Sequence, residues 1–96
     1  MNVTTSTTPV AMPEQLTLNG AVQALNRLSE ALSRQPGPTV VLDAEPLKVF
    51  DTSAVAVLLE LRNALLSQGK SLQVSRMPQR LQALFTLYGV AELLPA

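Results

Sequence analysis

Residues 40–61 read VVLDAEPLKVFDTSAVAVLLEL, and this stretch decides the fold. Its apolar start is typical of a buried strand, and its apolar end indicates a buried helix. The loop between them delivers one carboxyl group and two hydroxyls to the first turn of that helix. Backbone N–H groups at a helix start lack partners and carry partial positive charge. Asp51, Thr52 and Ser53 are therefore expected either to cap the helix or to offer hydroxyls to a partner or a phosphate.

Strand and helix patterns alternate along the rest of the chain. The expected elements are a short strand at 15–18, helices at 21–34, 53–67 and 78–89, and strands at 39–43 and 71–75. Two apolar stripes are expected to face the core: Val22, Leu25, Leu28 and Leu32 in the first helix, and Leu81, Leu84, Phe85 and Tyr88 in the third. The short links predict an α/β fold, with a single small, mainly parallel or mixed β-sheet flanked by helices.

No long linker divides the chain, so one domain is expected over residues 14–96. Residues 1–13 precede it, either as a tail or as an edge strand formed by the threonine-rich segment 2–8. The strand at 39–43 is continuously apolar, which is typical of a strand buried on both faces of a parallel sheet. The helix at 53–67 is apolar nearly all round for two turns. It is therefore expected to pack on the sheet and on a second neighbour.

Composition argues against catalysis and for a protein partner. The 96 residues include no cysteine and no histidine, which removes thiolate chemistry, the commonest general base and the commonest metal ligand. No enzyme activity or cofactor is therefore expected. Seven basic and seven acidic residues cancel, so nucleic acid is not an expected partner either. Only 15% of the residues are charged and 47% are apolar. Such low polar cover favours an exposed apolar face that binds another protein, although many alanines and leucines would also be explained by helix formation.

No apolar stretch approaches the roughly 18 residues that span a bilayer. The longest, at 54–59, is interrupted by Glu60 and Arg62. The N-terminus lacks a positive charge before an apolar run, as a secretory signal would have. A cytoplasmic protein without membrane insertion is therefore expected.

Two groups of charges lie near the loop. Asp43, Glu45 and Asp51 could in principle bind Mg²⁺, but a helix cap and solvated loop residues explain them better, so no metal is expected. Arg76 and Arg80 begin the third helix, where they either clamp an anion or form a solvated rim.

Four segments together resemble a STAS domain, the module shared by sulfate transporters and anti-sigma factor antagonists. They are VLDA (41–44), FDTSAVAVLL (50–59), QGKSL (68–72) and LFTLYGV (84–90). Asp51 to Ala54 match the family motif Asp-(Ser/Thr)-(Ser/Gly)-(Gly/Ala), with Ala54 where Gly is frequent. The similarity covers residues 14–95 and implies the STAS fold.

Within this family, the short chain ending in LYGVAELLP (87–95) is most similar to the small STAS subunit of the Mla phospholipid ABC transporter. The resemblance implies a cytoplasmic, non-catalytic subunit, peripheral at the inner membrane, that binds and supports the transport ATPase. This transporter moves phospholipids between the inner and outer membranes and maintains outer-membrane lipid asymmetry. The residues expected to contact the partner are Asp51, Thr52, Ser53, Glu60, Arg62, Asn63, Arg76, Gln79 and Arg80.

An alternative function follows from the same resemblance. The family's key hydroxyl falls on Thr52, and in anti-sigma factor antagonists this position is phosphorylated by a partner kinase. Thr52 or Ser53 would then be the phosphoacceptor, and the partners would be a kinase and an anti-sigma factor. Phosphorylation adds about −1.5 to −2 charge, which a close-packed interface would not tolerate.

Overall fold

The computed structural model describes residues 10–93. Its elements in chain order are β1 (Val10–Ala11), β2 (Gln15–Leu16), α1 (Ala21–Ser33), β3 (Thr39–Asp43), β4 (Val49–Phe50), α2 (Ser53–Leu66), β5 (Ser71–Ser75), α3 (Gln79–Leu87) and the 3₁₀ turn η1 (Ala91–Leu93). This is the predicted α/β architecture. The predicted tail or edge strand at residues 2–8 lies outside the described residues.

All described strand pairs are parallel, as predicted, but they form two ladders. β3 lies between β1 and β5, in the order β1-β3-β5, and β2 pairs separately with β4. The sequence did not predict β4. The strand expected at 15–18 ends at Leu16, because the backbone N–H of Leu18 binds a side chain instead of a neighbouring strand.

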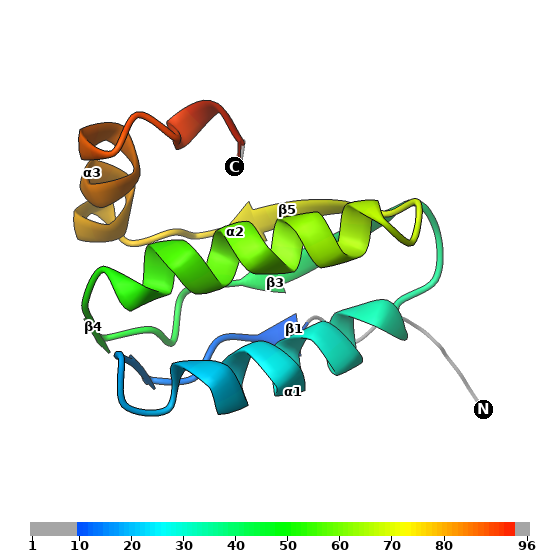
Figure 1. The fold of residues 1–96 in the computed structure, drawn as a ribbon, viewed down its shortest axis with the longest axis horizontal. Coiled ribbons are helices and arrows are strands. Elements are labelled where there is room, and N and C mark those ends of the chain that lie inside the picture. Colours follow the sequence, from blue (N-terminus) through cyan, green and yellow to red (C-terminus); the bar gives the residue numbers. More distant parts are fainter. Residues whose placement is uncertain (1–9, 94–96) are drawn as a thin grey trace.

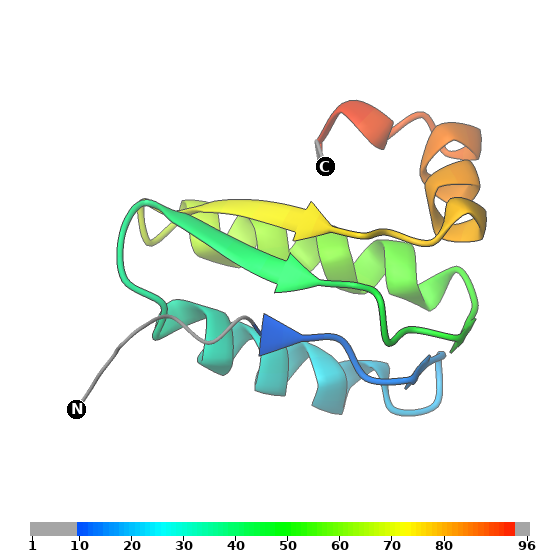
Figure 2. The same ribbon diagram turned by 180° about the vertical axis from the view of Figure 1, so that it is seen from behind.

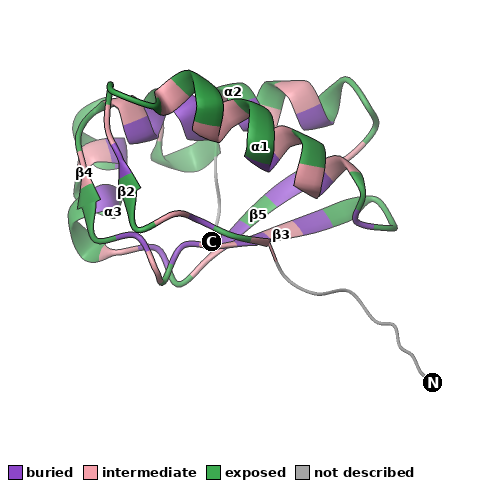
Figure 3. Cartoon of the chain, turned by 90° about the horizontal axis from the view of Figure 1, so that it is seen from below, coloured by how far each residue is buried: buried purple, intermediate pink, exposed green. Residues whose placement is uncertain are grey.

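Helices α1 and α2 lie side by side on one face of the β1-β3-β5 sheet (Figures 1 and 2). The strand order advances in one direction, and right-handed crossovers of this kind place both helices on the same side. Val40, Leu42 and Val74 face the helices and are fully buried, whereas Gln73 on the other face is exposed. This alternation is visible along β3 and β5 in Figure 3.

The prediction that residues 39–43 are buried on both faces is therefore wrong. Within residues 10–93 no helix covers the second face, and Val41 in the middle of β3 is only partly buried there. The prediction failed because it took every apolar residue of the strand as buried. Val41 is apolar, yet no helix among residues 10–93 covers it.

Helix α2 is the centre of the core. It contacts α1, α3 and β5, which agrees with the expectation that it packs on the sheet and on further neighbours. Its buried residues are Ala54, Val55, Val57, Leu58, Leu61 and Leu65. One stripe stays in solvent, and it begins with Thr52, Ala56 and Glu60. This stripe is the side of α2 that another molecule can reach.

The buried side chain of Gln35 pairs with the backbone of β3. Its Nε2 donates to the Val41 carbonyl at 3.1 Å, and its Oε1 accepts from the Val41 N–H at 2.9 Å. The primary amide thereby satisfies both the N–H and the C=O of Val41 in the middle of the strand. No pattern in the sequence singled out this residue.

Candidate partner-binding site

The loop before α2 is organised by Asp51. Its Oδ1 accepts a hydrogen bond from the Ser53 N–H at 2.8 Å, and its Oδ2 accepts one from the Leu18 N–H at 3.1 Å. The Asp51 carbonyl also accepts from Ala54 N–H at 3.0 Å. Asp51 is therefore the capping side chain of α2, as one of the two sequence interpretations proposed.

The same hydrogen bonds keep Asp51 ionised. The bond from the Leu18 N–H, followed by the bond from the Ser53 N–H, holds the pKa of the Asp51 carboxyl below its usual range. Both carboxylate oxygens are thus occupied by backbone donors of this chain.

Thr52 has a different role from Asp51. It already has helical backbone angles, φ −63° and ψ −16°, and its hydroxyl makes no capping hydrogen bond. Of the alternatives left open for this residue, a cap formed by the Thr52 side chain is therefore excluded, because Asp51 caps the helix one residue earlier. The Thr52 side chain is exposed, whereas Ser53 is half-buried and begins the helix. The Thr52 hydroxyl is left facing solvent.

A depression of about 550 Å³ opens beside Thr52. Arg80 borders it from α3, with its guanidinium 5.2 Å from the centre of the Phe50 ring. In Figure 1 the start of α2 lies beside β4 and α3, so residues from these three segments can line one depression. The depression is lined by Leu18, Phe50, Asp51, Thr52, Ser53, Arg80, Ala83 and Leu84. Four of the predicted site residues, Asp51, Thr52, Ser53 and Arg80, are thus brought together.

Two smaller depressions lie along the exposed stripe of α2. One, of about 340 Å³, is lined by Thr52, Val55, Ala56, Leu59, Tyr88 and Val90. The other, of about 110 Å³, is lined by Ala21, Val22, Leu25, Ala56, Val57 and Glu60. Thr52 lines the first and second of these three depressions and Ala56 lines the second and third, so the three are neighbours. We call their combined lining the Thr52 surface.

Large apolar side chains are exposed on the Thr52 surface. Leu18 is 79% exposed, Val22 70% and Tyr88 52%. The predictions that Val22 and Tyr88 face the core are therefore wrong: both lie at the exposed ends of their stripes. The sequence signal that could have found them is their position, because each sits at a helix terminus where a stripe runs beyond the core.

The other predicted contact residues lie around this surface. Glu60 belongs to it, and exposed Asn63 continues the stripe roughly 16 Å from Thr52 along the helix axis, at ~1.5 Å per residue. Arg62 is half-buried, and its Nη1 donates to Asn63 Oδ1 at 3.4 Å. Gln79 is exposed on α3 but does not line the three depressions.

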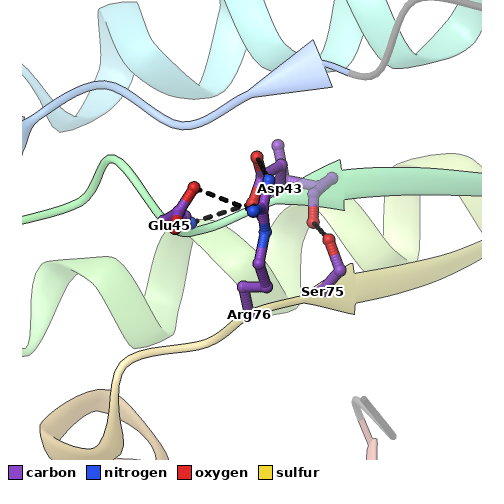
Figure 4. A network of polar contacts seen from close by, with 5 residues as sticks. Asp43, Glu45, Ser75 and Arg76 are labelled. Carbon is purple, nitrogen blue, oxygen red and sulfur yellow. Dashed lines mark hydrogen bonds and ion pairs between the residues drawn. The ribbon is translucent and has the colours of Figure 1, made fainter.

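Arg76 is engaged elsewhere, at the ends of β3 and β5 (Figure 4). Its Nη2 and Nε donate to the two oxygens of Asp43 at 2.6 and 3.1 Å, and its Nη1 lies 2.9 Å from Glu45 Oε1. The Arg76 guanidinium lowers the pKa of Asp43, and Asp43 in turn raises the pKa of Arg76. Arg76 thus binds carboxylates of its own chain instead of clamping a foreign anion together with Arg80.

The acidic residues near the loop do not form one cluster. Asp43 and Glu45 share Arg76, whereas both carboxylate oxygens of Asp51 are bound by backbone N–H groups. Within residues 10–93, no three acidic, histidine or cysteine side chains are grouped so as to hold a metal ion. None of the helices in that range is both long enough and apolar enough to cross a membrane.

Comparison with known proteins gives one family. The family model described as "Mlab, STAS domain" matches residues 3–95. Comparison with curated proteins gives no match.

Proposed function

Since the chain belongs to the STAS domain family, with the Mlab type as its matching model, we propose that it is a non-catalytic subunit of an ABC transporter. It binds and supports the ATPase of a system that moves phospholipids between the inner and outer membranes. It works in the cytoplasm and reaches the inner membrane through this partner.

One observation carries the proposal: Thr52 is exposed in the middle of a surface that also exposes large apolar side chains. Because Asp51 caps α2, the hydroxyl makes no capping bond. A hydroxyl held on a fixed first helical turn offers one donor and one acceptor to a partner without disturbing the fold.

The surroundings of Thr52 support a protein partner. Leu18, Val22 and Tyr88 are large apolar groups in solvent, and exposed apolar groups gathered in this way mark interaction sites. Glu60 and Arg80 place a charge at each end. An apolar centre with a charged rim is the usual composition of a protein–protein interface.

Asn63, Arg62 and Gln79 extend the proposed contact area beyond the Thr52 surface, along α2 and at the start of α3. Arg76 is assigned a structural role, because its guanidinium already has two carboxylate partners.

A phosphorylation-switched anti-sigma factor antagonist is the second candidate function. The exposure of the Thr52 hydroxyl supports it, since a kinase needs an accessible acceptor. Of the two candidate acceptors Thr52 is the better, because Ser53 is half-buried.

The test is binding of the tagged chain to the purified ATPase subunit of the Mla-type transporter from the same organism. We expect the wild type to form a stable complex and Thr52→Glu to lose it, because a carboxylate buried without a partner is costly. Thr39→Glu is the matched control, since Thr39 is also exposed but lies outside the Thr52 surface. A wild type that does not bind this ATPase, but is recovered from cells phosphorylated on Thr52, would favour the second candidate.

A further inference from the structure

Arg80 is the basic residue that lines the Thr52 surface, and its charge has no acidic partner within the described part of the chain. All seven acidic side chains of the sequence lie in that part, and ion pairs join Glu30 to Arg34 and both Asp43 and Glu45 to Arg76. Asp51 borders the same depression, where its carboxylate accepts two backbone hydrogen bonds and forms no ion pair with Arg80.

The Arg80 guanidinium lies over the ring of Phe50. The guanidinium carbon lies 5.2 Å from the centre of the Phe50 ring, within the range of a cation–π contact. Stacking of this kind restricts the side chain but leaves the N–H donors at the guanidinium edge free for a planar acceptor. Arg80 is exposed, so these donors are reachable from outside.

From this arrangement we propose that the partner presents an aspartate or glutamate carboxylate to Arg80, flanked by apolar residues that cover Leu18 and Leu84. This inference rests on the proposed function and specifies the chemistry of its partner. The apolar lining excludes water from the pair, and a planar carboxylate matches the fork of the guanidinium. A cationic or purely apolar partner segment would leave the Arg80 charge covered and unpaired.

The experiment measures the affinity of the same purified ATPase subunit for four variants. We expect Arg80→Gln to weaken binding about tenfold and Arg80→Glu to weaken it further, because the variant carboxylate repels that of the partner. Arg80→Lys is expected to retain part of the affinity, since it keeps the charge but not the planar fork. The matched control is Arg27→Glu, which makes the same change of charge on an exposed arginine of α1 outside the Thr52 surface. Circular dichroism checks that each variant is folded.

Two further measurements make the test specific. Raising the salt concentration from about 0.05 M to about 0.5 M should weaken wild-type binding more than that of Arg80→Gln. Lysine substitutions of surface carboxylates on the ATPase should include one that restores binding to Arg80→Glu and not to Arg27→Glu.

The possible failures are distinguishable. If Arg80→Gln and Arg80→Glu bind like wild type while Thr52→Glu does not, the carboxylate inference is overturned and the proposed function stands. If no lysine substitution on the ATPase rescues Arg80→Glu, the paired carboxylate is likewise overturned. If the wild type itself does not bind the ATPase, the proposed function fails together with the inference.

Discussion

Asp51 Oδ2 accepts a hydrogen bond from the backbone N–H of Leu18, 33 residues earlier in the chain, at 3.1 Å. The other oxygen of the same carboxylate caps α2 through Ser53 N–H. One side chain therefore fixes the start of the helix that carries Thr52 and the exposed loop that carries Leu18. The two halves of the depression beside Thr52 are positioned relative to one another by this carboxylate.

Thr52→Ala should separate binding from folding. Because the hydroxyl makes no capping bond, we expect the free energy of unfolding to change by less than about 0.5 kcal/mol. The complex with the ATPase should nevertheless weaken. Urea denaturation and a binding titration on the same preparation test both parts, and a large loss of stability would show that Thr52 is structural.

Ala56→Arg should block the Thr52 surface without unfolding the protein. Ala56 is exposed and lines both of the smaller depressions, so a long charged side chain there fits the monomer but obstructs a docked partner. We expect loss of the ATPase complex in a gel-filtration assay. Ala11→Arg, at an exposed alanine of β1, should leave the complex intact. Unchanged binding by Ala56→Arg would place the interface elsewhere.

Acid should destabilise the protein through Asp43 and Asp51. Both carboxyls have a lowered pKa in the folded state, so the unfolded chain binds protons more readily than the native one. Their contribution to stability is complete above the unfolded carboxyl pKa of about 3.9 and is lost as the pH falls through the lower folded values. Melting temperatures measured between about pH 6 and pH 2 should fall over this window, and Asp43→Asn should flatten the decline. A melting temperature that rises with acid would contradict the assignment.

Arg76 should tolerate glycine better than alanine. Its backbone has φ +53°, a left-handed conformation that glycine adopts readily and alanine does not. Both variants lose the ion pairs with Asp43 and Glu45, so their difference isolates the backbone term. We expect Arg76→Gly to melt at a higher temperature than Arg76→Ala. Equal melting temperatures would mean that the fold does not impose the left-handed conformation at this position once the ion pairs are lost.

Gln35→Leu should cost more than its size suggests. Leucine cannot pair with the N–H and C=O of Val41, and leaving a buried polar group unpaired costs about 1–3 kcal/mol. The same substitution at Gln23, an exposed position of α1, is the control and should be nearly neutral. Chemical denaturation of both variants tests this, and equal stabilities would show that water replaces the amide.

Periodicity predicted the large elements well because burial dominates them. The predicted helix at 21–34 and strands at 39–43 and 71–75 agree with α1, β3 and β5 to within one residue. Strand β4 could not be found in this way, because two residues are too few to show alternation. The composition of β3 also could not show that, among residues 10–93, both crossover helices lie on the same face of the sheet.

At the candidate site, the sequence predicted the residue types but not their division of roles. The motif at residues 51–54 placed an acid and two hydroxyls at the helix start, yet only geometry shows that Asp51 caps while Thr52 faces solvent. Arg76 and Arg80 are four residues apart, and the sequence offers no reason to distinguish their roles. The left-handed backbone of Arg76 turns it toward Asp43, whereas Arg80 one helical turn later meets Phe50.

The short ladder of β2 and β4 affects how stable the subunit is in the cell when no partner is bound. Each strand contributes two residues, so the corner with Leu18 and Asp51 is joined by few backbone hydrogen bonds and should open at a lower free energy than the core. Amide hydrogen exchange there should be faster than in β3. A partner seated across Leu18 and Thr52 would close this opening and stabilise the native state by mass action. The steady-state amount of the subunit would then follow the abundance of its partner, with proteolysis removing the unbound excess.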